Sequence, residues 1–141
     1  MNLYKNTCNL LGKKYNLGSQ DLNCGVDCFT LIVCYLRNRG IDIPVDESFN
    51  GLTFDNYKSA YLKDKQSLMK TAVEYLKTKT KKIQFYQIMA GDILLIESCN
   101  GNRSFGIDTG NGFAISISET DGVISLSKND FKIIEAFRCL A

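Results

Sequence analysis

Apolar residues recur with helical spacing in the first half of the chain and gather into short runs in the second half. Residues 28–39 (CFTLIVCYLRNR) are apolar on most sides, which predicts a helix buried inside the domain. Asp27 is placed to cap the start of this helix, and Gly40 is placed to end it.

The rest of the first half contains two weaker helical patterns. Residues 56–79 form a helical region with an apolar stripe at Leu68, Ala72, Tyr75 and Leu76. Residues 2–11 are compatible with a short helix. We interpret residues 12–27 and 45–55 as loops, and the basic segment 77–84 (KTKTKKIQ) as a solvated helix end and loop.

The second half contains five short runs rich in β-forming residues, separated by Gly, Asn and Asp. They are GDILLIES, SFGIDTG, GFAISISE, GVISLSK and KIIEAFRC. Helices followed by strands predict an α+β fold, with N-terminal helices packed on a five-stranded, mainly antiparallel sheet. We find no linker or repeat, so we expect residues 1–141 to form a single domain.

Composition excludes several classes of function. The chain has 17 basic and 15 acidic residues, a net charge of +2, which is too balanced for a nucleic-acid-binding surface. It has no apolar run near the roughly 18 residues of a membrane helix, and its start does not resemble a signal peptide. We therefore expect no nucleic-acid or membrane partner and synthesis in a reducing cytoplasm.

Six cysteines and no histidine restrict the chemistry further. The cysteines, at positions 8, 24, 28, 34, 99 and 139, include no C-x2-C pair, so we expect neither a metal nor another cofactor. A reducing compartment also disfavours disulfides, including one between Cys24 and Cys28. Most of these cysteines are then small buried hydrophobic residues.

Cys28 is the exception, because it follows Asp27 at the start of the predicted helix. The free N–H groups of a helix N-terminus favour a nucleophilic thiolate. The chain contains no imidazole, however, to accept the proton of this thiol.

The segment from Leu10 to Pro44 resembles the opening of NlpC/P60 cysteine peptidases, particularly those associated with phage tails. The matching residues are Gly12, Tyr15, Gly18, Asp27, Cys28, Gly40, Ile41 and Pro44. The run AGDILLI is similar to the Pro-Gly-Asp strand of that family, and SFGIDTGNGFAISIS to its His-Val-Gly-Ile strand and the turn after it. The resemblance implies a papain-like NlpC/P60 fold.

The resemblance also implies a role for four positions. Cys28 matches the nucleophile, and Tyr15 matches a tyrosine near the active site. Ser104 stands at the position of the catalytic histidine, and Ser116 at that of the residue that orients it. A serine hydroxyl does not accept a proton near neutral pH, so the chain is expected to be a degenerate member without acid–base catalysis. Whether both serines face Cys28 depends on strand register.

These observations favour a catalytically inactive structural protein of a bacteriophage tail, in the tail tip, the baseplate or tail assembly. The expected partners are other tail-tip and tail-tube proteins, with copies of the chain in a symmetric homo-oligomeric ring. The expected location is the virion tail, after synthesis in the host cytoplasm.

Two alternatives stay open. The first is an active cysteine hydrolase that cleaves peptidoglycan with Cys28 and an atypical base, either Asp27 or Asp108. A carboxylate next to the thiolate would raise its pKa, which opposes activation. The second is a binding module that holds cell-wall peptide without cutting it. Asp92 is interpreted as a turn residue, and residues 49–61 (FNGLTFDNYKSAY) either form an adhesive surface or pack on their own domain.

Overall fold

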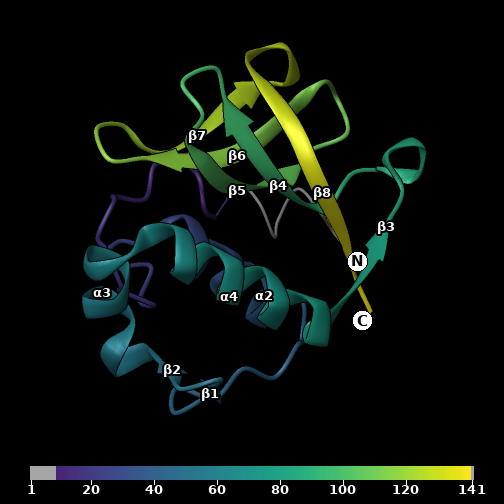
Figure 1. Cartoon of the computed structure of the whole chain (residues 1–141). Helices are drawn as coiled ribbons and strands as arrows, with labels where there is room; N and C mark the ends of the chain where they lie inside the picture. Colours follow the sequence, from purple (N-terminus) through teal and green to yellow (C-terminus); the bar gives the residue numbers. More distant parts are fainter. Residues whose placement is uncertain (1–8, 141) are drawn as a thin grey trace.

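The computed structural model describes residues 9–140, which form three α-helices, two short 3-10 helices (Phe85–Gln87 and Lys128–Asp130) and eight strands (Figure 1). The helices are α2 (Cys28–Asn38), α3 (Phe54–Lys63) and α4 (Lys65–Lys79). The strands are β1 (Ser48–Phe49), β2 (Leu52–Thr53), β3 (Thr80–Ile83), β4 (Ile93–Ser98), β5 (Arg103–Asp108), β6 (Phe113–Ser118), β7 (Gly122–Ser127) and β8 (Phe131–Cys139).

The main sheet has six strands in the order β3-β8-β4-β5-β6-β7, and every neighbouring pair is antiparallel. Strands β1 and β2 form a separate hairpin. Figure 1 shows the three helices together on one side and the sheet on the other. The α+β prediction is therefore confirmed, but the predicted number of five strands is wrong.

The additional strand, β3, lies in the basic segment predicted to be a loop. Its two middle residues, Lys81 and Lys82, are exposed, while Thr80 and Ile83 are buried. The strand pairs only with β8, so it is an edge of the sheet. Lysines are common on edge strands because they oppose unwanted pairing with other chains, and they hide the usual strand pattern.

The buried helix α2 begins and ends where the sequence predicts, within one residue. The Asp27 side chain accepts hydrogen bonds from the backbone N–H groups of Phe29 and Thr30, which caps the helix. Gly40 follows the C-cap with φ of 87°, a left-handed conformation that suits glycine at this position. Every residue from Cys28 to Leu36 is buried.

The predicted helical region at 56–79 is confirmed, and it consists of two helices. Asp64 is extended (φ −158°, ψ 92°), ends α3 and caps α4 through the backbone N–H of Ser67. The predicted loop at 45–55 contains β1, β2 and the start of α3. Of the predicted helix at 2–11, residues 9–11 form a turn and the remainder lies outside the described residues.

The sheet is buried on both faces at its centre. Ile93 and Leu95 of β4 join the main core with α2 and α4, whereas Leu94 and Ile96 join a second cluster with Ala114. This alternation explains why β4 has a continuous apolar sequence instead of an alternating one. Phe29 of α2 packs against Phe105 of β5, with ring centroids 6.0 Å apart, and fixes the helix on the sheet.

Within residues 9–140, no helix is both long and apolar enough to cross a membrane. The cysteines of this part of the chain are free thiols; Cys24 and Cys99 are exposed, and Cys28, Cys34 and Cys139 are buried.

Candidate functional site

Cys28 is the first residue of α2, and its side chain lies between the helix and the sheet. It is 9% exposed. Hydrogen bonding from the side chain of Ser104 and from the backbone of Phe105, both on β5, acts to lower the pKa of this thiol. The packing of α2 on the sheet thus places the thiol against β5. This strand contains Ser104, which the resemblance puts at the position of the catalytic histidine.

The electrostatic environment keeps this thiol protonated. Its pKa is raised from an ordinary value of 9.0 to about 11, chiefly because burial penalises the thiolate and also because Asp27 carries a like charge. The hydrogen bonds from Phe105 and Ser104 and the charge of Lys65 act in the opposite direction, but they are weaker. The protonated thiol therefore predominates at pH 7.

Ser104 and Ser116 lie next to each other on neighbouring strands. Their hydroxyl oxygens are 3.4 Å apart, and the Ser116 hydroxyl donates a 2.7 Å hydrogen bond to the carbonyl of Phe105. Ser116 is 1% exposed, and Ser104 is half-buried. The strand register therefore brings Ser104 and Ser116 together beside Cys28, in one series of neighbouring side chains.

This series contains no group that accepts a proton near neutral pH. A hydroxyl donates a hydrogen bond to the sulfur, but it does not take up the thiol proton as imidazole does. The thiol and the two hydroxyls thus lie together, and neither hydroxyl is a basic side chain.

Asp27 is too fully engaged to serve as the base. Its two carboxylate oxygens accept four hydrogen bonds, from the backbone N–H groups of Gly18, Phe29 and Thr30 and from the Tyr57 hydroxyl, at 2.7–3.0 Å. Three of these bonds go to Oδ1 and one to Oδ2, so the carboxylate has a structural role in the cap and at Tyr57.

Asp108 is too far from Cys28 to be the base. It ends β5, four residues after Ser104, which corresponds to roughly 13 Å along an extended strand. Its side chain accepts from the backbone N–H of Gly110 and lies 2.5 Å from the Lys128 ammonium. Both carboxylates proposed as atypical bases therefore have structural roles.

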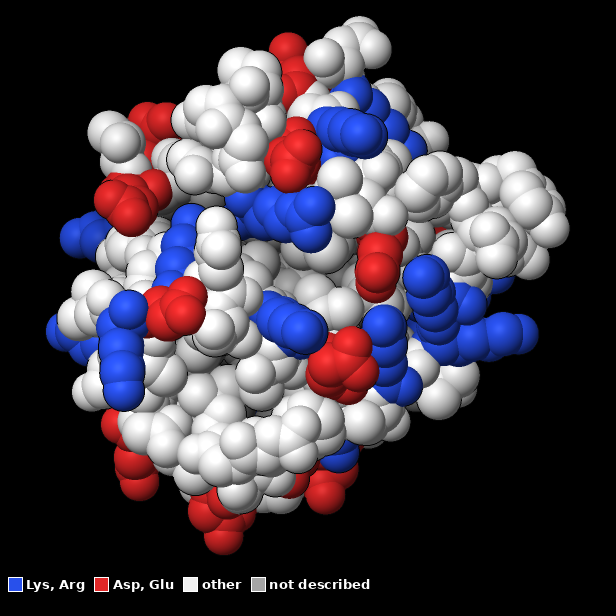
Figure 2. Space-filling view, viewed as in Figure 1, with Lys and Arg blue, Asp and Glu red and all other residues white. Residues whose placement is uncertain are grey.

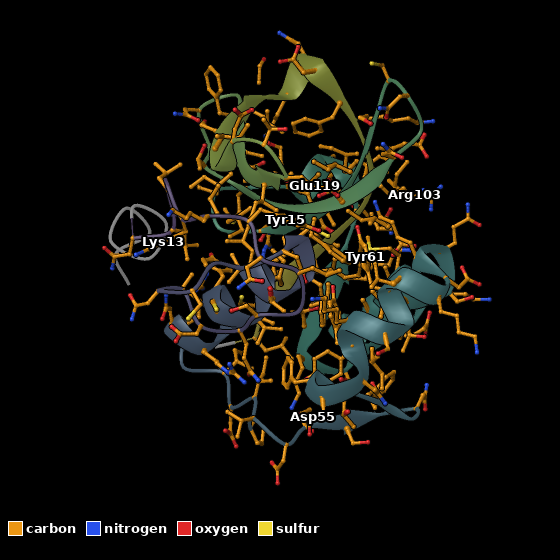
Figure 3. The ribbon with its side chains drawn as sticks, turned by 90° about the vertical axis from the view of Figure 1, so that its left-hand side faces the viewer. Lys13, Tyr15, Asp55, Tyr61, Arg103 and Glu119 are labelled. Carbon is orange, nitrogen blue, oxygen red and sulfur yellow. The ribbon has the colours of Figure 1, made fainter. Side chains whose placement is uncertain are left out.

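Tyr15 lies beside the site and makes its contact with α3. It forms an isolated bridge with Val26, next to the helix cap. Figure 3 shows Tyr15 and Tyr61 near each other, with Glu119 beyond them. Burial, followed by the charge and hydrogen bond of Tyr61, raises the Tyr15 pKa well above its ordinary value. The hydroxyl is thus a neutral hydrogen-bonding group that joins the N-terminal loop to α3.

Asp92 has the contacts of a turn residue and not those of a catalytic acid. Its oxygens accept two hydrogen bonds of 3.0 Å from the Arg138 guanidinium and one of 2.9 Å from the backbone N–H of Met89. It therefore ties the turn before β4 to β8, as the sequence interpretation expects.

The sequence reasoning did not identify Tyr57 or Lys65 as part of this site. Tyr57 is 1% exposed, and its hydroxyl donates a hydrogen bond to Asp27. The segment at 49–61 therefore packs in part on its own domain. Lys65, the first residue of α4, acts on Cys28 through its charge. Neither residue has a local sequence signal, because only the packing of α3 and α4 beside α2 brings them near.

The comparisons with known proteins agree on the fold. The model of the NlpC/P60 family matches residues 12–138. The crystal structure of the NlpC/p60 domain of the peptidoglycan hydrolase SagA is similar, with a TM-score of 0.58 and 22% identity over 96% of this chain and 94% of that chain. No curated protein matches the sequence.

A second similar structure is that of a Staphylococcus aureus protein described as similar to lipoprotein, NLP/P60 family. It has a TM-score of 0.58 and 16% identity and covers 99% of this chain. The match covers 40% of that longer chain. At these identities the two structures support the fold and nothing beyond it.

Proposed function

The chain belongs to the NlpC/P60 family, and from this premise we propose that it is a catalytically inactive member with a structural role in a bacteriophage tail. The observation that carries the proposal is the contact of Cys28 with Ser104, next to Ser116. The thiol, whose pKa is raised to about 11, meets two hydroxyls where a peptidase needs a base.

The inactive state has a direct energetic basis. Thiol nucleophiles react as thiolates, and an adjacent imidazolium is the usual group that lowers their pKa. The Lys65 charge and the Ser104 hydrogen bond favour the thiolate of Cys28, but burial and Asp27 outweigh them. The Cys28–Ser104–Ser116 series also has no general acid to protonate the amine that leaves when the cysteine is acylated.

The tail assignment is supported by the resemblance of Leu10–Pro44 to phage-tail-associated members of the family. Loss of the base leaves the helix cap, the aromatic packing around Phe29 and the sheet intact. The domain therefore stays folded and can offer a binding surface without catalysing a reaction. We propose that copies of the chain form a symmetric ring in the tail and contact tail-tip and tail-tube proteins.

The decisive assay compares turnover by the wild type and the Cys28→Ala variant. The purified proteins are incubated with peptidoglycan, and released muropeptides are quantified by mass spectrometry. Because SagA, whose domain is similar in fold, is a peptidoglycan hydrolase, that domain serves as the positive control. We expect both proteins to release no more than buffer does. Release that disappears in Cys28→Ala would refute the inactive state and favour the hydrolase with an atypical base.

The location is tested separately. Antibodies against the chain, with quantitative mass spectrometry of purified virions, are expected to detect it in the tail at a fixed copy number that matches a ring. Its absence from virions would exclude the tail role and leave the loss of catalysis unaffected.

A further inference from the structure

A large groove lies along α4, on the side of this helix that faces the sheet. One wall is α4 between Lys65 and Lys77, and the other consists of Leu95, Arg103 and Glu135 of β4, β5 and β8 with the turn between β4 and β5. We call it the α4 groove. Figure 2 shows a hollow on this face, with basic and acidic side chains around it.

The size and floor of the α4 groove suit a peptide. Its volume is about 790 Å³, within the usual range for ligand sites of roughly 300–1,000 Å³. Met69, Val73 and Leu95 supply apolar surface, and charged side chains of both signs surround it. A ligand with short apolar side chains and charged groups fits this lining better than a purely apolar molecule does.

One end of the groove lies near the Cys28 site, although Cys28 and Ser104 do not line it. Lys65 lines it and also acts on Cys28 through its charge. Arg103 lines it and directly precedes Ser104 in β5.

The charges of the helical wall are not all neutralised within the protein. Lys77 pairs with Glu74 at 3.3 Å, and on the opposite wall Arg103 pairs with Glu97 at 3.1 Å. Within residues 9–140, Lys65 and Lys70 form no ion pair. The Lys65 ammonium lies over the Tyr61 ring, 5.6 Å from its centroid, so both lysines carry positive charge without a carboxylate partner.

The opposite wall contains an unsatisfied acceptor. The Oε2 atom of Glu135 is buried and has no hydrogen-bond partner among the described residues, and the nearest cation, Lys82, is 3.8 Å from the other oxygen. Glu135 pairs with Leu95 in the sheet, two residues from Glu97, which pairs with Arg103. A buried acceptor without a donor is costly, so a bound N–H group would relieve that cost.

We propose that the α4 groove binds an extended peptide segment with an ammonium or amide donor at Glu135 and a carboxylate at Lys65 and Lys70. The inference rests on the proposed function in one respect, namely that the segment is held and not cleaved. It assigns a partner class to a surface outside the Cys28–Ser104–Ser116 series.

The test is a titration of the ¹⁵N-labelled protein with three end-blocked hexapeptides, followed by NMR. One has glutamate at its first position and lysine at its last, the second has the reverse order, and in the third both are glutamine. We expect at least one charged peptide to shift the amide signals of α4 and β4 and to bind at least tenfold more tightly than the neutral one.

Variants locate the site. Lys65→Glu with Lys70→Glu is expected to weaken binding at least tenfold, and Glu135→Gln several-fold. The matched control, Lys58→Glu with Lys63→Glu on α3, makes the same charge change on exposed residues outside the groove and should change affinity less than twofold. The proposal is overturned if no peptide shifts the α4 signals, or if the groove variants bind like the wild type.

Mass spectrometry of the bound peptide separates the two proposals. An intact peptide supports both. A cleaved peptide supports the groove and contradicts the inactive state, whereas absence of binding contradicts the groove and leaves the inactive state standing.

Discussion

The Cys28 thiol experiences opposing influences on its pKa, and the unfavourable ones are larger. The start of α2 and the hydrogen bonds from β5 favour the thiolate, while burial and Asp27 favour the thiol. In an active cysteine peptidase, an imidazolium adds to the influences that favour the thiolate. In the inactive member that we propose, Ser104 stands at the position of that imidazolium and contributes only a hydrogen bond.

The first prediction concerns the pH dependence of Cys28 alkylation by iodoacetamide. Because its pKa is raised to about 11, the Cys28 thiol stays protonated at pH values where an ordinary cysteine ionises. The thiolate fraction, and with it the alkylation rate, should rise about tenfold per pH unit from pH 7 to about pH 10. Peptide mapping by mass spectrometry gives the rate, and exposed Cys99 in the same protein reports general accessibility. A reaction already at its plateau at pH 7 would show an activated thiolate.

Ser104→His tests whether the missing imidazole is what silences the thiol. An imidazolium beside Cys28 favours the thiolate, so the alkylation midpoint should fall by one pH unit or more relative to the wild type. Ser125→His places the same side chain on an exposed position of β7 and should leave the midpoint unchanged. Equal profiles for both variants would contradict the assigned role of position 104.

Among the elements, α2 depends on a cap that also connects other segments. The Asp27 carboxylate holds Gly18 of the N-terminal loop, the first turn of α2 and Tyr57 of α3 together. One side chain therefore positions the nucleophile helix against two other parts of the chain.

Asp27→Ala should lower the free energy of unfolding by about 3 kcal/mol, because it removes the cap and leaves buried donors unsatisfied. Asp64→Ala removes the exposed cap of α4 and serves as the control, with less than half that effect. Urea unfolding followed by circular dichroism measures both. Similar losses for the two variants would mean that the buried contacts of Asp27 add nothing to the cap.

The N-terminal loop is joined to β7 by a close backbone approach. Val123 donates to the carbonyl of Lys13 at 2.8 Å, and a Cβ atom on Gly122 would lie 2.2 Å from that same oxygen. Gly122 also has φ of 73°, which L-residues rarely adopt. This glycine permits the loop to lie against the sheet.

Gly122→Ala is predicted to cost about 3 kcal/mol, since it adds a backbone clash to the roughly 1 kcal/mol of conformational strain. Gly112→Ala shares the positive φ, 86°, but a Cβ there meets nothing within 4 Å, so it should cost about 1 kcal/mol. Thermal unfolding of the two variants gives the difference. If both variants lost the same stability, the loop at Lys13 would not lie against Gly122 in solution.

Across the whole molecule, one core connects the two halves of the chain. The main cluster extends from Leu10 to Cys139 and includes residues of α2, α4 and the sheet. We therefore predict a single cooperative unfolding transition, with an enthalpy of roughly 100 kcal/mol near 60 °C for a chain of this length. Scanning calorimetry with equal calorimetric and van't Hoff enthalpies would agree, and two resolved transitions would show separately folding units.

Local patterns were enough to predict α2, its cap at Asp27 and five of the six strands of the main sheet. Each of these follows from neighbouring residues, such as a capping side chain before an apolar run. The break at Asp64 and the strand β3 were missed, because a single extended residue interrupts a continuous helical pattern and exposed lysines conceal a strand edge.

What the sequence by itself determined is the chemical content of the site: a cysteine at a helix start and no histidine in the chain. Only the tertiary structure decided that Ser104 and Ser116 meet at that cysteine, that Asp27 and Asp108 are occupied elsewhere, and that a groove continues along α4. The reason is physical. Composition and capping are properties of adjacent residues, whereas contacts between strands and helices depend on register and packing across the whole chain.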